Sequence, residues 1–287
     1  MKRILITGAG SYIGASFAKY LTDNFPNAYE VDTVDMLTDS WKETSFSSYD
    51  AIFHVAGIAH IKETQENAPL YYKVNRDLPV QVAEKAKADG VSQFVFLSTM
   101  SVYGMETGVI TKDTIPCPKS NYGKSKLQAE QGLSQLADDH FKVVILRPPM
   151  VFGAGCKGNY QTIAKIVDKL PVFPKVKNQR SLIYIDNLCS FVKMAIDKEL
   201  SGLYFPDNAH RVDTFSMAKA IADAKGKKIW FSSLLGLCAK AAGVFIPMAR
   251  KAFGTLVYSN TEDFAYCYCV VNNADALRFS AEQEDKV

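Results

Sequence analysis

The sequence predicts an α/β protein with a doubly wound parallel sheet and a smaller C-terminal lobe. Short apolar runs typical of buried strands alternate with helical patterns through the first half of the 287 residues. Because parallel strands need crossover segments to connect them, this alternation favours a parallel sheet with helices on both faces. The expected strands are residues 3–6, 28–34, 51–55, 93–97 and 143–146.

Helical patterns fill the segments between these strands. The crossover before the fourth strand has apolar residues at helical spacing, which predicts one amphipathic helix, and Gly90 marks its end. The apolar positions of this helix are Ala68, Val74, Leu78, Val82 and Ala86.

Composition indicates an ordinary globular protein, because 48% of the residues are hydrophobic and 22% are charged. The net charge of +3 is small and its lysines are scattered, so the sequence argues against a nucleic-acid partner.

The six cysteines lack both C-x-x-C spacing and nearby histidines, so we expect free thiols in a reducing compartment and no metal site. The first strand begins almost at Met1 and leaves no room for a signal peptide, which predicts a cytoplasmic protein.

The stretch 229–248 is apolar enough to raise the question of a membrane segment. Lys240 and Pro247 interrupt it, and it is too short for a clean span. We expect a packed helix here, and contact with a membrane surface or a partner is the disfavoured alternative.

A glycine loop follows the first strand and opens the first helix. Its sequence, ITGAGSYIG at residues 6–14, allows backbone N–H groups to approach a dinucleotide pyrophosphate closely. The partial positive charge of the helix N-terminus adds up to about 1 kcal/mol for an anion. The loop residues expected to contact the cofactor are Gly8, Gly10, Ser11, Tyr12, Ile13 and Gly14.

An acidic residue ends the second strand. The carboxylate of Asp35 can accept hydrogen bonds from both adenosine ribose hydroxyls, and it would repel a 2′-phosphate. No Lys or Arg follows until Lys42, so NAD is favoured over NADP. Asp32 is the alternative residue for the same role.

These features predict a Rossmann dinucleotide-binding domain at residues 1–150, to which residues 180–206 return. After Arg147 and two prolines the alternation fades, and further prolines separate shorter elements. We expect residues 151–179 and 207–287 to form the substrate-binding lobe.

The segment YGKSK places Tyr122 and Lys126 four residues apart, so their Cβ atoms lie about 5–6 Å apart on one helical face. A free tyrosine has a pKa near ~10 and is a poor base at neutral pH. A neighbouring ammonium and a cationic nicotinamide ring would both lower the pKa of Tyr122. Together with the glycine loop, the pair predicts hydride-transfer chemistry, which neither segment would predict alone.

A hydroxyl residue follows the fourth strand. Within LSTMSVYG, Thr99 lies two residues beyond the expected end of the strand, at the carboxyl edge where doubly wound sheets bind ligands. Its hydroxyl can hydrogen-bond a reacting oxygen there.

Over nearly its whole length the chain resembles the extended short-chain dehydrogenase/reductase family, the NAD-dependent nucleotide-sugar epimerases and dehydratases. The resemblance rests on TGAGSYIG, DAIFHVAG, LSTMSVYG, YGKSK, LRPPMVFG and RSLIYIDNL. One residue departs from the pattern, because Ser11 stands where the family usually has its middle glycine.

The resemblance implies a role for each matching residue. Tyr122 would be the acid/base, Lys126 its cationic neighbour and a ribose ligand, and Thr99 the hydroxyl that positions the sugar oxygen. The residues implied beside the nicotinamide are Ala56, Gly57, Asn75 and Pro148.

The resemblance also implies a nucleotide-diphosphate sugar as substrate. Arg180 resembles the arginine that holds the diphosphate, and Asn159 resembles a phosphate contact. The similarity is strongest to the branch that acts on UDP-N-acetylhexosamines and their 4-keto-6-deoxy derivatives in polysaccharide assembly. Family resemblance further suggests a homodimer formed through two helices, one of which carries Tyr122.

Three functions remain open at this level. The first is an NAD-dependent UDP-sugar 4-epimerase. The second is an NAD(P)H-dependent reductase of UDP-4-keto-6-deoxy-hexosamines, favoured by Met150 where some epimerases have an asparagine. The third is a non-catalytic dinucleotide sensor on the same fold. Dehydration is disfavoured, because Met100 and Ser101 supply no carboxylates beside Thr99.

Overall fold

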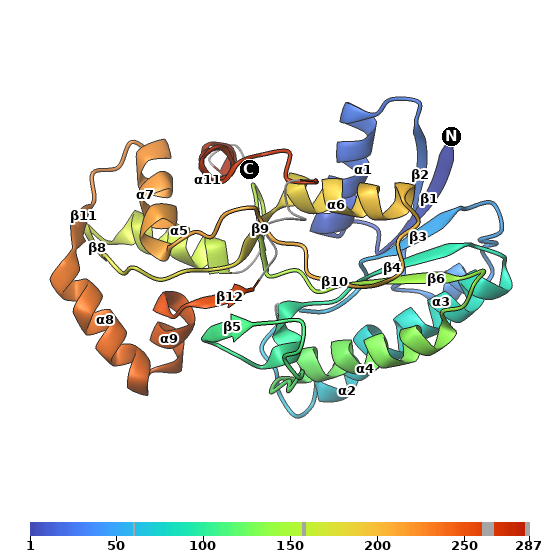
Figure 1. Ribbon diagram of the computed structural model, residues 1–287, viewed down its shortest axis with the longest axis horizontal. Helices are drawn as coiled ribbons and strands as arrows, with labels where there is room; N and C mark the ends of the chain where they lie inside the picture. The colour runs from blue at the N-terminus through green and yellow to red at the C-terminus, as the bar shows by residue number, and fades with distance from the viewer. Residues whose placement is uncertain (60, 157–158, 260–266, 285–287) are drawn as a thin grey trace. The chain divides into compact units, whose positions relative to one another are not determined.

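The computed structural model describes residues 1–59, 61–156, 159–259 and 267–284. Its main sheet has six parallel strands in the order β10-β6-β4-β3-β1-β2 (Figure 1). The sequence-based expectation of a doubly wound parallel sheet is confirmed. These strands are β1 (Lys2–Thr7), β2 (Tyr29–Val34), β3 (Ala51–His54), β4 (Gln93–Leu97), β6 (Lys142–Leu146) and β10 (Gly202–Tyr204).

The strand order indicates where a doubly wound sheet of this kind binds a ligand. From β1 the chain moves outward to β2, and it then crosses to β3 and β4 on the other side of β1. In a doubly wound sheet, ligands bind beyond the carboxyl ends of the strands at this reversal, here between β1 and β3.

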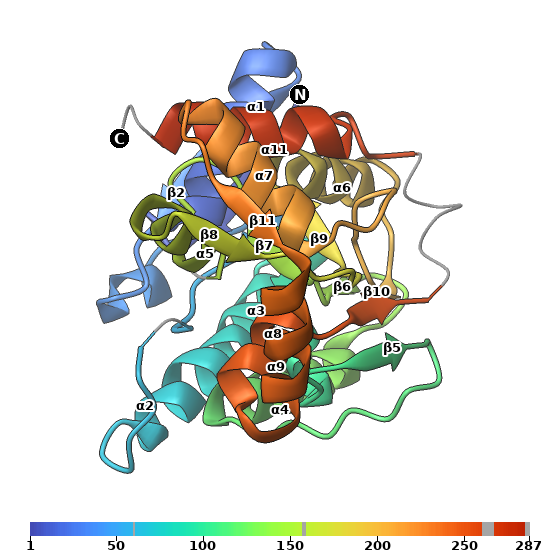
Figure 2. The ribbon, with the colours of Figure 1, turned by 90° about the vertical axis from the view of Figure 1, so that its left-hand side faces the viewer.

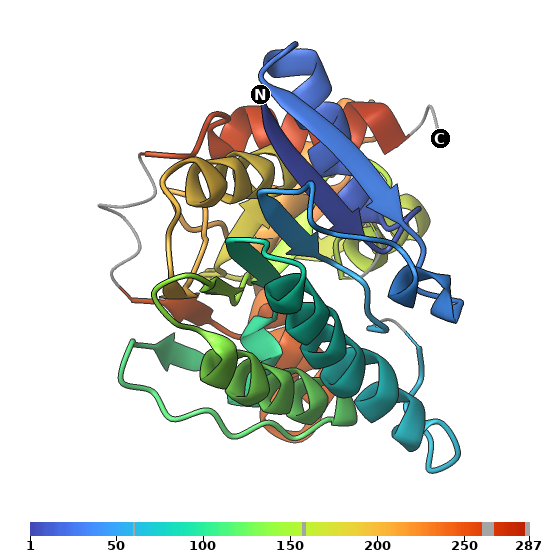
Figure 3. The same cartoon turned by 90° about the vertical axis from the view of Figure 1, so that its right-hand side faces the viewer.

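Helices cover both faces of this sheet, which explains why β3 and β4 are buried along their whole length. Figures 1 and 3 show α1 and α6 on one face and α3 and α4 on the other. Their bounds are α1 (Tyr12–Asn24), α3 (Leu78–Ala88), α4 (Asn121–Leu136) and α6 (Ile185–Asp197).

The crossover before β4 is one unbroken helical run from Ala68 to Ala88, as expected, but it contains a π-helical turn that the sequence did not predict. A short helix α2 (Ala68–Tyr72) passes into a π-helical turn at Lys73–Asp77 and only then into α3. Within this turn the Leu78 N–H donates to the Lys73 carbonyl, five residues back. The following Pro79 has no N–H to continue the regular pattern.

The chain divides into two compact units. Unit 1 comprises Met1–Gly104, Pro116–Pro148 and Cys189–Pro206, and it contains the whole six-stranded sheet. Unit 2 comprises Met105–Ile115, Pro149–Leu188 and Asp207–Val287. Two segments are grouped differently from the expected boundaries: residues 105–115 and 180–188 both belong to unit 2.

Unit 2 is built from short parallel strand pairs and helices. Its strand pairs are β12 with β5, β7 with β9, and β11 with β8. Residues 105–115 belong here because β5 pairs with β12, almost 150 residues later in the chain. The strands are β5 (Gly108–Ile110), β7 (Met150–Phe152), β8 (Val172–Pro174), β9 (Leu182–Tyr184), β11 (Trp230–Ser232) and β12 (Leu256–Tyr258). The helices are α5 (Asn159–Lys169), α7 (Thr214–Ala224), α8 (Ser233–Phe245), α9 (Pro247–Phe253) and α11 (Asn273–Glu284).

Among the helices of the described residues, none is both long enough and apolar enough to cross a membrane.

Candidate active site

The glycine loop lies against the ends of two neighbouring strands. The N–H groups of Gly8 and Ala9 donate to the Val34 carbonyl at the end of β2, over 3.0 and 3.3 Å. Gly8 has φ +102° and Gly10 φ +76°, conformations that favour glycine. A Cβ on Gly8 would lie only 3.0 Å from the Cα of Ala56, after β3, so this position excludes other side chains.

Ser11 serves as the N-cap of α1. Its Oγ accepts the N–H of Gly14 over 3.2 Å, and its φ of −68° requires no glycine. A Cβ on Gly14 would lie 3.0 Å from Ile6 and 3.1 Å from Val55, so this glycine allows α1 to pack closely on the sheet. Tyr12 and Ile13 form the first turn of the helix, and the departure at Ser11 is compatible with an anion site at its N-terminus.

Replacement of Gly8 tests the loop as a cofactor site. We expect Gly8→Ala to weaken NAD binding about tenfold, because the methyl group would push the loop away from Ala56. Gly90→Ala is the matched control: Gly90 also has positive φ, at +85°, yet among the described residues no atom beyond its chain neighbours lies within 4 Å of the added Cβ. Isothermal titration of both variants with NAD measures the difference, and equal affinities would refute the assignment.

Asp35 lies immediately after β2 with an exposed carboxylate. One of its oxygens accepts the Leu37 N–H over 2.9 Å. The alternative residue, Asp32, accepts the Tyr49 hydroxyl over 2.9 Å and lies 3.7 Å from the Arg3 guanidinium. Asp35 is therefore better placed to receive a ribose.

The nearest cation in sequence after Asp35 is already paired. Lys42 lies 3.1 Å from the Asp39 carboxylate, three residues earlier in the chain. This pairing favours a cofactor without a 2′-phosphate, as the sequence predicts.

Thr99 and Tyr122 meet beyond the carboxyl end of β4. The Thr99 side chain accepts the Ser101 N–H over 3.1 Å and lies beside the Tyr122 side chain. Burial raises the pKa of Tyr122, the neighbouring Thr99 side chain lowers it, and the nearby Tyr71 raises it. Without a bound cofactor, Tyr122 therefore holds its proton.

The N-terminus of α4 is anchored firmly, which positions Tyr122. The Ser120 Oγ caps the helix by accepting the Gly123 N–H over 3.1 Å. The Glu63 carboxylate accepts the N–H groups of Asn121 and Tyr122 over 2.9 and 3.1 Å. A negative charge at this end of a helix is also favoured by the helix dipole.

Lys126 lies one turn after Tyr122 and points into the sheet. Its Nζ donates to the Leu97 carbonyl over 2.8 Å and lies 4.5 Å from the centre of the Phe96 ring. Burial lowers the pKa of Lys126 to about 7, although the Glu130 carboxylate raises it.

The lowered pKa of Lys126 predicts a pH-dependent stability of the cofactor-free protein. Between pH 7 and pH 10.5 the unfolded chain holds a proton at this site that the folded chain has lost. The free energy of unfolding therefore rises with pH across this interval, and Lys126→Met should remove that part of the rise. Urea midpoints at pH 7 and 9 measure it, with the exposed neighbour Lys124→Met as control. Unchanged pH dependence in Lys126→Met would contradict the assignment.

Asn75 stabilises the loop that follows β3 by hydrogen bonds to its backbone. Its side chain accepts the Ile58 N–H and donates to the Ile58 carbonyl, both over 2.9 Å, and donates to the Ser125 Oγ over 3.4 Å. A Cβ on Gly57 would lie 2.9 Å from the Asn75 Oδ1 and 3.4 Å from the Lys126 Nζ. Asn75 thus holds Gly57 close to Lys126, and its position in the π-helical turn explains that irregularity.

Pro148 is buried beside the turn after β4, where its carbonyl accepts the Met100 N–H over 2.9 Å. The residues expected from the sequence that lie within unit 1 therefore surround the carboxyl ends of β1 to β4 and β6. They are the glycine loop, Asp35, Ala56, Gly57, Asn75, Thr99, Tyr122, Lys126 and Pro148.

The two expected substrate contacts belong to unit 2. The Arg180 guanidinium donates to the carbonyls of Gly254 and Lys251 over 3.1 and 2.7 Å, and burial lowers its pKa. These bonds tie the segment after β8 to the end of α9. Asn159 is the first residue of α5, and its side chain lies outside the described part of the structure.

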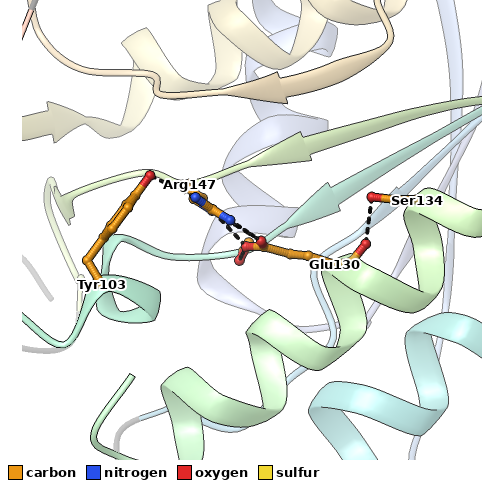
Figure 4. A network of polar contacts seen from close by, with 5 residues as sticks. Tyr103, Glu130, Ser134 and Arg147 are labelled. Carbon is orange, nitrogen blue, oxygen red and sulfur yellow. Dashed lines mark hydrogen bonds and ion pairs between the residues drawn. The ribbon is translucent and has the colours of Figure 1, made fainter. Parts of the chain in front are cut away.

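Sequence reasoning missed a buried polar network one turn after Lys126 on α4 (Figure 4). The Arg147 guanidinium binds the Glu130 carboxylate with Nη2 and Oε2 2.5 Å apart, and it donates to the Tyr103 hydroxyl over 2.7 Å. Ser98 hydrogen-bonds the same carboxylate. The network joins the ends of β4 and β6 to α4, and the position of Glu130 four residues after Lys126 was its only signal in the sequence.

His54 is a second residue that the sequence did not single out. It is fully buried at the end of β3, and its Nδ1 lies 2.8 Å from the Thr7 Oγ1. Burial and the charge of Lys126 lower the pKa of His54 to about 3, so the ring stays neutral beneath the site.

Comparisons with known proteins agree with this geometry. The model of the "NAD dependent epimerase/dehydratase family" matches residues 4–204. A UDP-glucose 4-epimerase of Vibrio cholerae is 32% identical over 257 residues, which cover 80% of this chain and 77% of that protein.

Solved structures share the fold. UDP-glucuronic acid 4-epimerase from Bacillus cereus, in complex with NAD, superposes with a TM-score of 0.74 and 18% identity over 99% of both chains. A dTDP-4-dehydrorhamnose reductase from Yersinia enterocolitica gives 0.72 and 21% identity over 99% of this chain and 100% of its own. The family match and the extent of the sequence similarity show that the chain belongs to the NAD-dependent epimerase/dehydratase family, the extended short-chain dehydrogenases/reductases.

Proposed function

We propose that this protein is an NAD-dependent nucleotide-sugar 4-epimerase that acts on UDP-sugars. The observation that carries the proposal is the position of the Tyr122 side chain beside Thr99, with Lys126 one turn away, in the unit that also contains the glycine loop. The V. cholerae relative, named a UDP-glucose 4-epimerase, supports the reaction and the nucleotide.

The residues of unit 1 fit NAD. The start of α1 and its glycine loop would hold the pyrophosphate, and Asp35 would accept the adenosine ribose hydroxyls. Ala56, Gly57, Asn75 and Pro148 would line the nicotinamide side. NADP is the less favoured cofactor, since Asp35 is exposed and Lys42 is paired with Asp39.

The chain's own residues handle the proton. The Tyr122 phenolate would remove the proton from the sugar C4 hydroxyl, while Thr99 holds that oxygen by a hydrogen bond. Burial raises the pKa of Tyr122, so positive charge must be added before it can act as a base. The chemistry that bound NAD supplies is reversible acceptance of the C4 hydride, together with a positive ring charge. Rotation of the 4-keto sugar before reversal would give the epimer.

Substrate recognition is assigned to unit 2. Arg180 would bind the diphosphate and Asn159 a phosphate oxygen, so the Arg180 guanidinium would exchange one of its carbonyl partners for the substrate. The proposal also includes a homodimer, formed through α4 and a second helix. It further includes a cytoplasmic location.

A 4-keto-sugar reductase is the second candidate, favoured by Met150 at the start of β7 and by the shared fold of the Yersinia reductase. A dinucleotide sensor is the third.

The purified protein separates the three functions. An epimerase should carry bound NAD, visible in its absorbance, and interconvert UDP-sugars without added nucleotide. A reductase should arrive without cofactor and consume NADH or NADPH with a UDP-4-keto sugar. Binding of NAD without turnover of any UDP-, dTDP- or GDP-sugar would leave the sensor and overturn both enzymatic assignments.

A further inference from the structure

Large apolar side chains are exposed together at one part of unit 2. Trp230 in β11 is 79% exposed, and Leu234 and Leu237 in α8 are 72% and 68% exposed. Ile246, just after α8, is 52% exposed. The stretch forms a helix that packs on one side, and its other side exposes apolar side chains. We call Trp230, Leu234, Leu237 and Ile246 the α8 face.

The inner side of α8 explains why the α8 face points outward. A Cβ on Gly236 would lie 2.1 Å from the Lys175 carbonyl oxygen, so the helix backbone rests directly on the segment after β8. A Cβ on Gly243 would lie 3.5 Å from the Cα of Arg250, because α8 and α9 run side by side (Figures 1 and 2). At 3.6 residues per turn, Leu234 and Leu237 lie on the side away from these two glycines.

The segment that carries the α8 face has basic charges only in its own sequence, and an acid from outside this segment, Glu106, lies 3.8 Å from Arg250. The sequence from Ala224 to Thr261 contains no Asp or Glu. Its basic residues are Lys225, Lys227, Lys228, Lys240, Arg250 and Lys251.

Three of these basic residues are exposed and lie near the apolar ones in the sequence. Lys228 lies two residues before Trp230, Lys240 lies on α8 three residues after Leu237, and Lys251 lies on α9. The others have partners within unit 2, such as Lys225, which lies 2.9 Å from Asp168. The lysine stems can lie along apolar surface while their ammonium groups stay in a polar layer.

We propose that the α8 face docks on the headgroup layer of an anionic lipid bilayer. A helix with leucines on one side, an exposed tryptophan at its start and lysines at its flanks has the composition of helices that lie in the plane of a membrane. The exposed lysines match a surface of uniform negative charge, such as phospholipid phosphates. This surface goes beyond the proposed 4-epimerase activity and does not depend on it.

A protein partner fits the same observations less well. The cores of protein interfaces are depleted in lysine, and a protein partner would need a dedicated acidic patch to match Lys228, Lys240 and Lys251. A bilayer supplies negative charge across its whole surface.

Co-sedimentation with vesicles tests the proposal on the full chain. Wild-type protein should sediment with vesicles of phosphatidylglycerol and phosphatidylethanolamine, and at least tenfold less with phosphatidylcholine vesicles. Binding should fall at about 1 M salt, where the Debye length is ~3 Å. The double variant Leu234→Gln/Leu237→Gln should reduce the bound fraction at least tenfold, and Lys240→Glu should weaken binding to the anionic vesicles alone.

Ile115→Gln is the matched control, because Ile115 is an apolar side chain of unit 2 that is 83% exposed and lies far from α8 in the sequence. It should bind vesicles as the wild type does.

Wild-type protein that stays in the supernatant, or a double variant that binds as well as the control, would overturn the proposal. If instead the double variant turns a dimer into a monomer and neither form binds vesicles, the face belongs to a second copy of the chain. Turnover of UDP-sugars in the same samples tests the proposed function separately.

Discussion

Tyr122→Phe should reduce kcat by at least about a thousandfold while leaving NAD affinity within about twofold of wild type. General acid–base groups contribute typically ~10²–10⁴-fold, and here the same oxygen must both remove and return the proton. The ring stays in place because Ser120 and Glu63 anchor the start of α4 independently of the hydroxyl. Steady-state kinetics with the best UDP-sugar and isothermal titration with NAD give the two values.

The control for this variant is Tyr72→Phe. Tyr72 is also a tyrosine of unit 1, and its hydroxyl donates to the Asn121 side chain over 3.3 Å, next to Tyr122 in the chain. Its loss should change kcat less than about threefold, because the hydroxyl is assigned no proton transfer. Comparable losses in the two variants, or retained turnover in Tyr122→Phe, would remove Tyr122 from the mechanism.

The sequence was sufficient for the features that depend on local pattern. Strand β4 at Gln93–Leu97 has the predicted bounds, because a short run of four apolar residues after Gln93, between Gly90 and a polar segment, has few alternatives. Parallel strands end at one edge, so the strand before Thr99 was enough to place this residue at the carboxyl edge of the sheet, while its role beside Tyr122 was implied by the family resemblance.

Features that depend on contacts between distant parts of the chain could not be predicted from the local sequence pattern. Glu130 looks like an ordinary exposed acid of a helix, and only the fold shows that Arg147 reaches it from the end of β6. The π-helical turn before α3 contains Asn75, whose side chain bonds to Ile58 in the distant loop after β3. Residues 105–115 belong to unit 2 because β5 pairs with β12. The sequence around β5 does not predict this distant pairing.

Arg180 shows a different limit. A planar, permanently charged guanidinium suits a diphosphate and backbone carbonyls equally well, so its residue type alone does not decide between them. In the structure two of its nitrogens bind the carbonyls of Lys251 and Gly254. Its role in substrate binding remains a prediction that the carbonyl contacts neither require nor exclude.

The second large effect is expected from the buried ion pair of Glu130 and Arg147. The two side chains are 5% and 8% exposed, so removal of one partner leaves the other buried without its counter-charge. Glu130→Met or Arg147→Met should each lower the free energy of unfolding by about 3–5 kcal/mol. This loss corresponds to a fall in Tm of roughly 6–20 °C for a chain of this size.

The double variant Glu130→Met/Arg147→Met distinguishes the cost of an unpaired buried charge from the cost of changed packing. Because it removes both charges and leaves an apolar interior, its cost should be well below the sum of the two single costs. Asp223→Asn is the surface control: its partner Lys219 is 55% exposed and the pair lies in solvent, so the change should stay within about 0.5 kcal/mol. Urea unfolding curves measure all four variants. Additive losses would mean that packing, and not charge pairing, makes this network important.

If charge pairing is what matters, Glu130→Met should also lower the pKa of Lys126, because the Glu130 carboxylate raises that pKa. The pH profile of turnover should then change as well.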